Sequence, residues 1–141
     1  MVYQLGCNYS KLLYRYFVLA LLLVGVCGFA NAEQINLDSG LKSKTIEVGK
    51  QVQIAADLKN NQGVEQRFAY IVQVQNENGI TVSLAWITGQ LTPGQSFTPS
   101  LSWTPDTAGH YDATIFVWES IDNPTALSPT LSLRINVQSS A

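Results

Sequence analysis

The side chains that could carry out chemistry are few and widely spaced. The chain has one histidine, His110, in a short turn segment beside Tyr111. A Ser–His–acid device needs a histidine that is held by an acid and faces a serine, and no serine of this chain lies in a G-x-S-x-G segment. Asp112 and Glu119 belong to one expected strand, but seven residues of strand separate them by about 23 Å, too far to flank one glycosidic bond. We therefore expect no enzyme activity.

Metal ligands are equally scarce. Both cysteines, Cys7 and Cys27, lie near the N-terminus, so the rest of the chain offers one histidine and no thiolate to a zinc ion. Glu119, Asp122 and Asn123 carry oxygen atoms of the kind that calcium prefers, but no D-x-D-x-D-G ladder accompanies them. We expect no metal site and no cofactor.

The charge balance argues against polyanionic partners. From Glu33 onward the chain has six bases and ten acids, a net charge of −4, and the bases form no cluster. Nucleic acids and anionic lipids attract proteins through basic patches. We therefore expect that neither a nucleic acid nor a lipid surface is a partner of this part of the chain.

Residues 1–32 have the three parts of a secretion signal. Lys11 and Arg15 form a positive start, an apolar run follows over residues 17–24, and Ala30-Asn31-Ala32 supplies a small-residue cleavage motif. Two alternatives stay open: an uncleaved membrane anchor over residues 12–30, close to the ~20 residues that span a bilayer, and a lipoprotein acylated at Cys27. We expect an exported protein, extracellular or in the cell envelope, which touches a membrane only through this segment if it is not removed.

After the signal, apolar and polar residues alternate with period two between turns rich in Gly, Pro and Asn. This pattern predicts an all-β fold, a seven-stranded antiparallel immunoglobulin-like β-sandwich over residues 44–138. A lead-in with a short edge strand at 35–37 precedes it over residues 33–43, and a tail of residues 139–141 follows it. The expected strands are 44–48, 51–59, 67–75, 80–88, 96–104, 110–119 and 130–138. In the absence of a disulfide, Trp86 or Trp103 is expected to fill the middle of the core.

Two local motifs support the sandwich. Thr92-Pro93-Gly94 is typical of a type II turn. The segment from Asp106 to Tyr111 matches the corner of immunoglobulin-type sandwiches, where a tyrosine hydroxyl binds backbone a few residues upstream.

These motifs also carry a resemblance. The stretches Leu91-Thr92-Pro93-Gly94-Gln95-Ser96, Leu101-Ser102-Trp103-Thr104-Pro105 and Ala108-Gly109-His110-Tyr111 are similar to the cell-adhesion-related sandwich domain of exported bacterial and archaeal surface proteins. The resemblance covers roughly residues 45–138. It implies an extracellular accessory or adhesion-type module.

If Tyr111 points inward, alternation turns Phe116 and Trp118 outward on the sixth strand, beside Gln73 of the third strand and Arg134 of the seventh. Exposed aromatics among amides and an arginine suit a binding face for a protein or a glycan. The alternative is structural: the loop over residues 120–129, with Ile121 and Leu127, folds back and covers both aromatics.

The sequence therefore predicts a non-enzymatic secreted or cell-surface adhesion or interaction module. It would bind a protein or glycan partner through Gln73, Phe116, Trp118 and Arg134. Two alternatives remain: a structural subunit or accessory domain of an envelope or appendage assembly, and, with the least support, a small secreted enzyme or metal chaperone.

Overall fold

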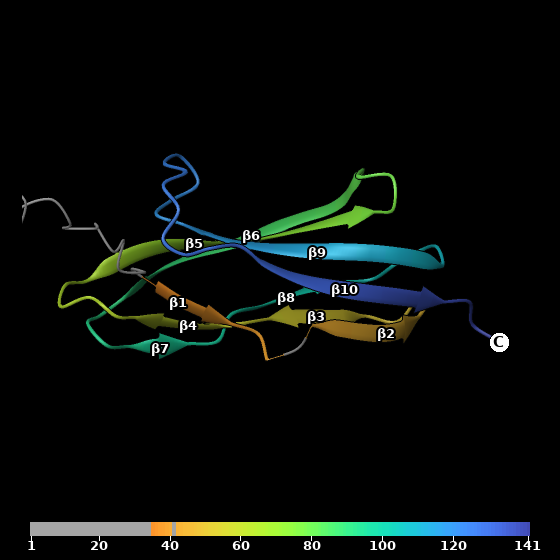
Figure 1. Ribbon diagram of the computed structural model, residues 1–141, viewed down its shortest axis with the longest axis horizontal. Coiled ribbons are helices and arrows are strands. Elements are labelled where there is room, and N and C mark those ends of the chain that lie inside the picture. The colour runs from red at the N-terminus through yellow and green to blue at the C-terminus, as the bar shows by residue number, and fades with distance from the viewer. Residues whose placement is uncertain (1–34, 41) are drawn as a thin grey trace, which may run out of the picture. The chain divides into compact units, whose positions relative to one another are not determined.

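Two layers of strands face each other across the apolar side chains that alternate along the sequence (Figure 1). The structure is a computed structural model that describes residues 35–40 and 42–141. The chain divides into two units, Met1–Ala32 and Glu33–Ala141, and the predicted signal segment lies outside the described residues. The described part is all-β, as predicted. No helix among these residues is long and apolar enough to cross a membrane.

The first layer is one five-stranded sheet in the order β2-β10-β9-β5-β6. Its strands are β2 (Ser43–Glu47), β5 (Gln66–Asn76), β6 (Thr81–Leu91), β9 (Gly109–Trp118) and β10 (Leu131–Gln138). Three of its pairings are antiparallel, but β2 and β10 run parallel, so the prediction of a wholly antiparallel sandwich was wrong at this edge. β2 follows β1 of the opposite layer and is not joined to β10 by a hairpin, so no tight turn forces the two strands to run antiparallel (Figure 1).

The second layer contains β1 (Ile35–Asp38), β4 (Asp57–Asn60) and β7 (Ser96–Phe97) in one sheet and β3 (Val52–Ala55) with β8 (Ser100–Trp103) in another. The single strands predicted over 51–59 and 96–104 are thus each divided in two. Both halves keep one register, with Val52 opposite Trp103 and Leu58 opposite Phe97. This register places Pro99 opposite Ala56, and proline has no N–H to give to a ladder. With β1, the division raises the predicted seven strands to ten in the described residues.

The core between the layers is apolar and closed at one end by the predicted corner. Tyr111 is buried, and its hydroxyl donates to the carbonyl of Thr107 at 2.9 Å. The ring of Trp103 meets that of Tyr111 edge-on at 4.9 Å between centroids. Tyr70 fills the middle, and its hydroxyl donates to the carbonyl of Ile54 in the opposite layer. Burial raises the pKa of the Tyr70 phenol far above its usual value.

One β-bulge decides which face β6 presents. The turn Asn76–Gly79 pairs Gln75 with Thr81, but beyond it Val74 pairs with Ser83, so Val82 is the extra residue. Because strand side chains alternate with period two, a one-residue slip moves every later side chain to the other face. Trp86 therefore lies opposite Ile71 on the outer face instead of opposite Tyr70 in the core. Of the two tryptophans expected in the core, Trp86 is exposed and Trp103 is half-buried against the core, while Tyr70 fills the middle.

Candidate binding face

The four residues predicted to bind a partner all lie on the outer face of the five-stranded sheet. Gln73 is on β5, Phe116 and Trp118 are on β9, and Arg134 is on β10. The register places Gln73 opposite Thr114, two positions before Phe116 on the same face, and Arg134 opposite Asp112. The structure thus brings the four onto one surface, but in two chemically different regions.

The first region is an apolar band across three strands. Phe116 and Trp118 are half-buried, and their ring centroids lie 5.9 Å apart. Across the sheet, Ile71 lies between Phe116 on one side and Trp86 on the other, and Ala69 lies beside Trp118. Directly opposed residues of neighbouring strands project from the same face. The band therefore runs without interruption from β9 to β6.

Sequence reasoning missed the β6 part of this band. The side chains of Val82, Leu84 and Trp86 are 45%, 55% and 53% exposed. Their in-phase spacing was visible in the sequence, but it was consistent with a core face as well. The signal that separates the two is the hairpin register, which the bulge shifts by one residue.

The second region is polar and lies nearer the other edge of the sheet. Arg134 Nε lies 3.3 Å from Asp112 Oδ1, and both side chains are more than half exposed. An exposed pair of this kind contributes little stability, so Arg134 stays available to a partner. Gln73 Nε2 donates to Thr81 Oγ1 at 2.9 Å, which positions the amide beside the apolar band.

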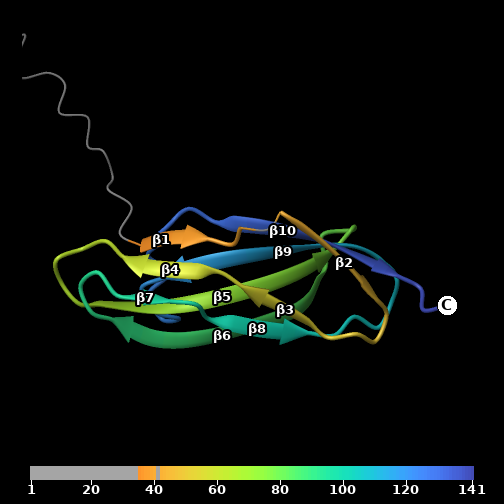
Figure 2. The same cartoon turned by 90° about the horizontal axis from the view of Figure 1, so that it is seen from below.

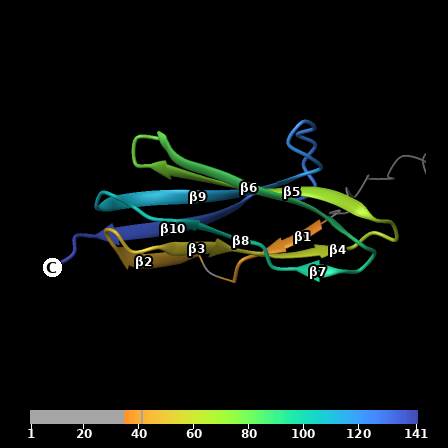
Figure 3. The ribbon, with the colours of Figure 1, turned by 180° about the vertical axis from the view of Figure 1, so that it is seen from behind.

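The loop after β9 forms a small hydrogen-bonded hairpin and leaves the aromatic pair half open. Trp118 bridges to Ala126, Glu119 N donates to the carbonyl of Thr125, and Leu127 N donates to that of Val117. Leu127 packs into the core, whereas Ile121 is 38% exposed. The loop rises from the outer side of the sheet (Figures 1 and 3). Leu127 thus anchors the loop in the core, while the rings of Phe116 and Trp118 keep intermediate exposure.

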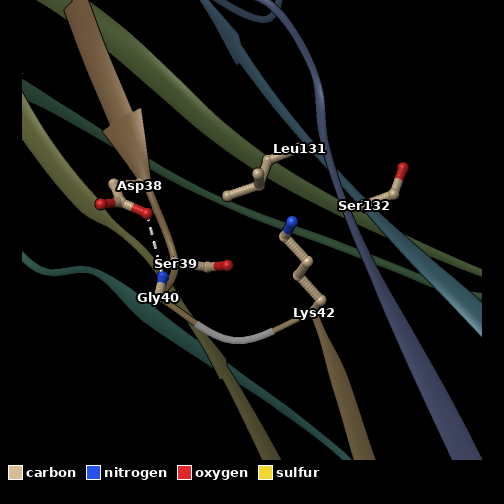
Figure 4. Close-up of a pocket in the computed structure, with 6 residues that line it drawn as sticks. All are labelled: Asp38, Ser39, Gly40, Lys42, Leu131 and Ser132. Atoms are coloured by element: carbon tan, nitrogen blue, oxygen red, sulfur yellow. Dashed lines mark hydrogen bonds between the residues drawn. The ribbon is translucent and has the colours of Figure 1, made fainter.

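Two hollows of the described surface are open to solvent. One, of about 310 Å³, is lined by Asp38, Ser39, Gly40, Lys42, Leu131 and Ser132 (Figure 4). Another, of about 450 Å³, lies beside the loop after β9 and includes Arg67, Gln90 and Glu119. Within the described ranges no three His, Cys, Asp or Glu side chains gather as metal ligands. Within the loop, Glu119 accepts a hydrogen bond from Asn123 Nδ2.

With this geometry in view, comparison with known proteins is informative. A family model described as S-layer A-like matches residues 15–136. The chain belongs to the S-layer A-like family. No curated protein is similar enough to count as a relative. Membership in the S-layer A-like family supports the prediction of a surface-protein β-sandwich, while adhesion stays a prediction.

Solved structures agree on the fold. The CARDB domain of a Pyrococcus furiosus protein, solved in complex with di-metal ions, is 18% identical, with 74% of this chain and 94% of that domain covered at a TM-score of 0.53. A β-glucosidase from Listeria innocua matches at 15% identity and a TM-score of 0.57, over 77% of this chain but 16% of the enzyme. A family 123 glycoside hydrolase from Clostridium perfringens matches at 10% identity and 0.55, over 77% of this chain and 28% of its own. At these identities the likeness establishes the immunoglobulin-like sandwich and nothing about activity.

Proposed function

We propose that this S-layer A-like chain is a non-enzymatic, exported module of the cell surface that binds a protein of a surface assembly through its outer sheet face. The carrying observation is the apolar band from Trp118 and Phe116 to Trp86 and Leu84. Soluble proteins seldom expose a contiguous apolar surface without using it for an interaction. Family membership favours the cell surface as the place where this interaction occurs.

A protein partner fits this face better than a glycan. Glycan sites combine an aromatic platform with closely placed polar groups, whereas Trp86 has the aliphatic Ile71 opposite it and Leu84 two residues before it on the same strand. The charged groups of this face, Arg134 and Asp112, lie at its far end. A hydrophobic centre with a polar rim is the usual anatomy of a protein–protein interface.

Binding to cell envelopes tests the proposal. The exported protein, recovered from cells that express the full chain, is mixed with envelopes that have been treated with protease, with periodate or with neither. We expect protease to abolish binding and periodate, which oxidises glycan diols, to leave it intact. The reverse pattern would support a glycan partner, and binding lost under neither treatment or absent from untreated envelopes would contradict the proposal.

Two variants connect the binding to the face. Trp118→Ala removes the largest half-buried side chain of the band, and it should weaken binding at least tenfold while the unfolding midpoint changes little. Ser132→Ala, an exposed position on the same face of β10, is the matched control and should bind as the wild type does. If Trp118→Ala unfolds the domain, Leu84→Ser makes the same test at a more exposed position of the band.

A further inference from the structure

One long side of the sandwich is formed by a segment of the chain without charged residues. Between Glu77 and Asp106, twenty-eight consecutive residues include no Asp, Glu, Lys or Arg. This segment forms β6, β7 and β8. Each is the last strand of its sheet, and the three lie along the same side of the domain (Figure 2). The chain therefore concentrates its uncharged sequence on sheet edges, the places where natural proteins usually put charges to prevent edge-to-edge pairing.

The opposite edge of the same sheet shows what a protected edge looks like in this domain. β2 has five residues, among them Lys44 and Glu47, with Lys42 and Lys50 close by. β6 has eleven residues, none charged and no proline, and among the described residues it pairs with β5 alone. A long, uncharged, apolar edge is a ready template for another strand. The contrast within one sheet indicates that β6 is left open.

The exposed apolar side chains gather on this side. Seven large hydrophobic residues of the described chain are exposed, and five of them lie in the uncharged segment: Ile80, Val82, Leu84, Trp86 and Phe97. The rest of the domain after residue 32 has a net charge of −4, so two copies repel each other weakly wherever their charged surfaces meet. They meet without like-charge repulsion along this side.

From these observations we infer that β6 is a self-association edge: two copies of this chain pair their β6 strands antiparallel about a two-fold axis. The two five-stranded sheets then form one continuous ten-stranded sheet, and the apolar bands of both copies join across the axis. A two-fold contact needs a self-complementary surface. An uncharged strand meets this condition because no residue faces its own charge in the partner. The inference rests on the proposed function, for it names a second copy as the protein partner of the β6 end of that face.

Sedimentation velocity of the exported full chain tests the inference. Between about 1 and about 100 µM, the range expected for a small interface, we expect a reversible monomer–dimer equilibrium. It should not weaken as salt is raised, since no charges pair across it. A protein that stays monomeric throughout, or whose dimer dissociates in salt, would overturn the inference.

Charge variants locate the contact. Leu84→Lys is placed at a 55% exposed position, so the fold should tolerate it, while it puts a positive charge on the uncharged edge of both copies. We expect the dimer dissociation constant to rise at least tenfold and to recover partly in high salt. Thr45→Lys, exposed on the opposite edge strand β2, is the control and should leave dimerisation unchanged. The inference fails if the two variants behave alike or in the reverse order.

Cross-linking gives a second readout, since residues 33–141 contain no cysteine. In a chain with Cys7 and Cys27 replaced by alanine, Trp86→Cys, at the middle of β6, should form a disulfide-linked dimer on mild oxidation, and Thr45→Cys should not. A monomeric protein that still loses envelope binding in Trp118→Ala would refute self-association and leave the proposed function standing. A dimer that binds no envelope would support self-association and contradict the proposed function.

Discussion

Replacement of Asn60 by alanine should destabilise the domain more than its position at the end of a short strand suggests. Asn60 is fully buried, with 0% exposure, and is one of two buried polar residues in the described core. Its Nδ2 lies within hydrogen-bond distance of the carbonyls of Val64, Leu91 and Thr92, at 2.8, 3.1 and 3.2 Å, and its Oδ1 accepts from Gln62 N at 3.0 Å. One amide therefore joins the turn after β4 to the turn after β6.

The expected loss can be worked out from these partners. The carbonyl of Leu91 is buried, and a buried acceptor without a partner costs about 1–3 kcal/mol, while the part-buried partners regain water and cost about 0.5–1 kcal/mol each. We expect Asn60→Ala to lower the free energy of unfolding by about 2–4 kcal/mol. In urea, with a slope of about 1–3 kcal/mol per molar, this is a midpoint shift of roughly 1–2 M. Tryptophan fluorescence during urea unfolding measures it.

Two companion variants make the reasoning refutable. Asn61→Ala removes the exposed neighbour and should change stability by less than about 0.5 kcal/mol. Asn60→Asp keeps the acceptor but turns a carboxylate toward three carbonyl oxygens, so burial and repulsion raise the pKa of the new side chain. Because the raised pKa lies above that of an aspartate in the unfolded chain, about 3.9, the variant loses stability as the pH rises from that value toward the raised pKa and regains it toward pH 4. If Asn60→Ala unfolds within 0.5 kcal/mol of the wild type, or Asn60→Asp shows no such pH dependence, the amide is not the connection described here.

Three further predictions follow from the packing. A Cβ at Gly89 would stand 2.8 Å from the buried ring of Phe68, so Gly89→Ala should cost about 1–3 kcal/mol by displacing that ring, which urea unfolding measures. Trp86→Ala should leave the free energy of unfolding within about 0.5 kcal/mol of the wild type, whereas Trp103→Ala, packed on the corner ring, should lower it by about 2–4 kcal/mol; equal losses would contradict the bulged register. The phenol of Tyr70 should stay protonated at pH values where exposed tyrosines ionise, which absorbance during an alkaline titration detects and Tyr70→Phe removes.

The sequence was sufficient where short-range geometry decides the outcome. The turn at Pro93–Gly94 forms as predicted, with Gly94 at φ 72° and Gln95 N donating to the carbonyl of Thr92. The corner at Tyr111 forms for the same reason, since its hydroxyl needs an acceptor only four residues away. These features depend on a few neighbouring residues, and the types of those residues are sufficient to predict them.

It was insufficient where a distant partner decides. The ladder interruption at Ala56 arises from Pro99, forty-three residues later, and is visible only once the two are known to be opposite. The face of β6 depends on the bulge at Val82, and alternation along Thr81–Leu91 is the same whichever face is inward. The outer face of β9, with Phe116 and Trp118, could be predicted because Tyr111 fixes the phase of that strand. The outer face of β6 could not, because no residue of β6 fixes its own phase.

The bulge therefore connects the fold to the proposed function. Without the extra residue, Val82, Leu84 and Trp86 would face Val74, Val72 and Tyr70 across the hairpin and enter the core. Close-packed interiors tolerate added volume poorly, and the residues that face these three positions of β5 are Ser83, Ala85 and Ile87, each smaller than the side chain it replaces. The large side chains must then remain outside, next to an open strand edge and beside Phe116 and Trp118. The proposed pairing of β6 with the β6 strand of a second copy would cover this apolar, uncharged strand.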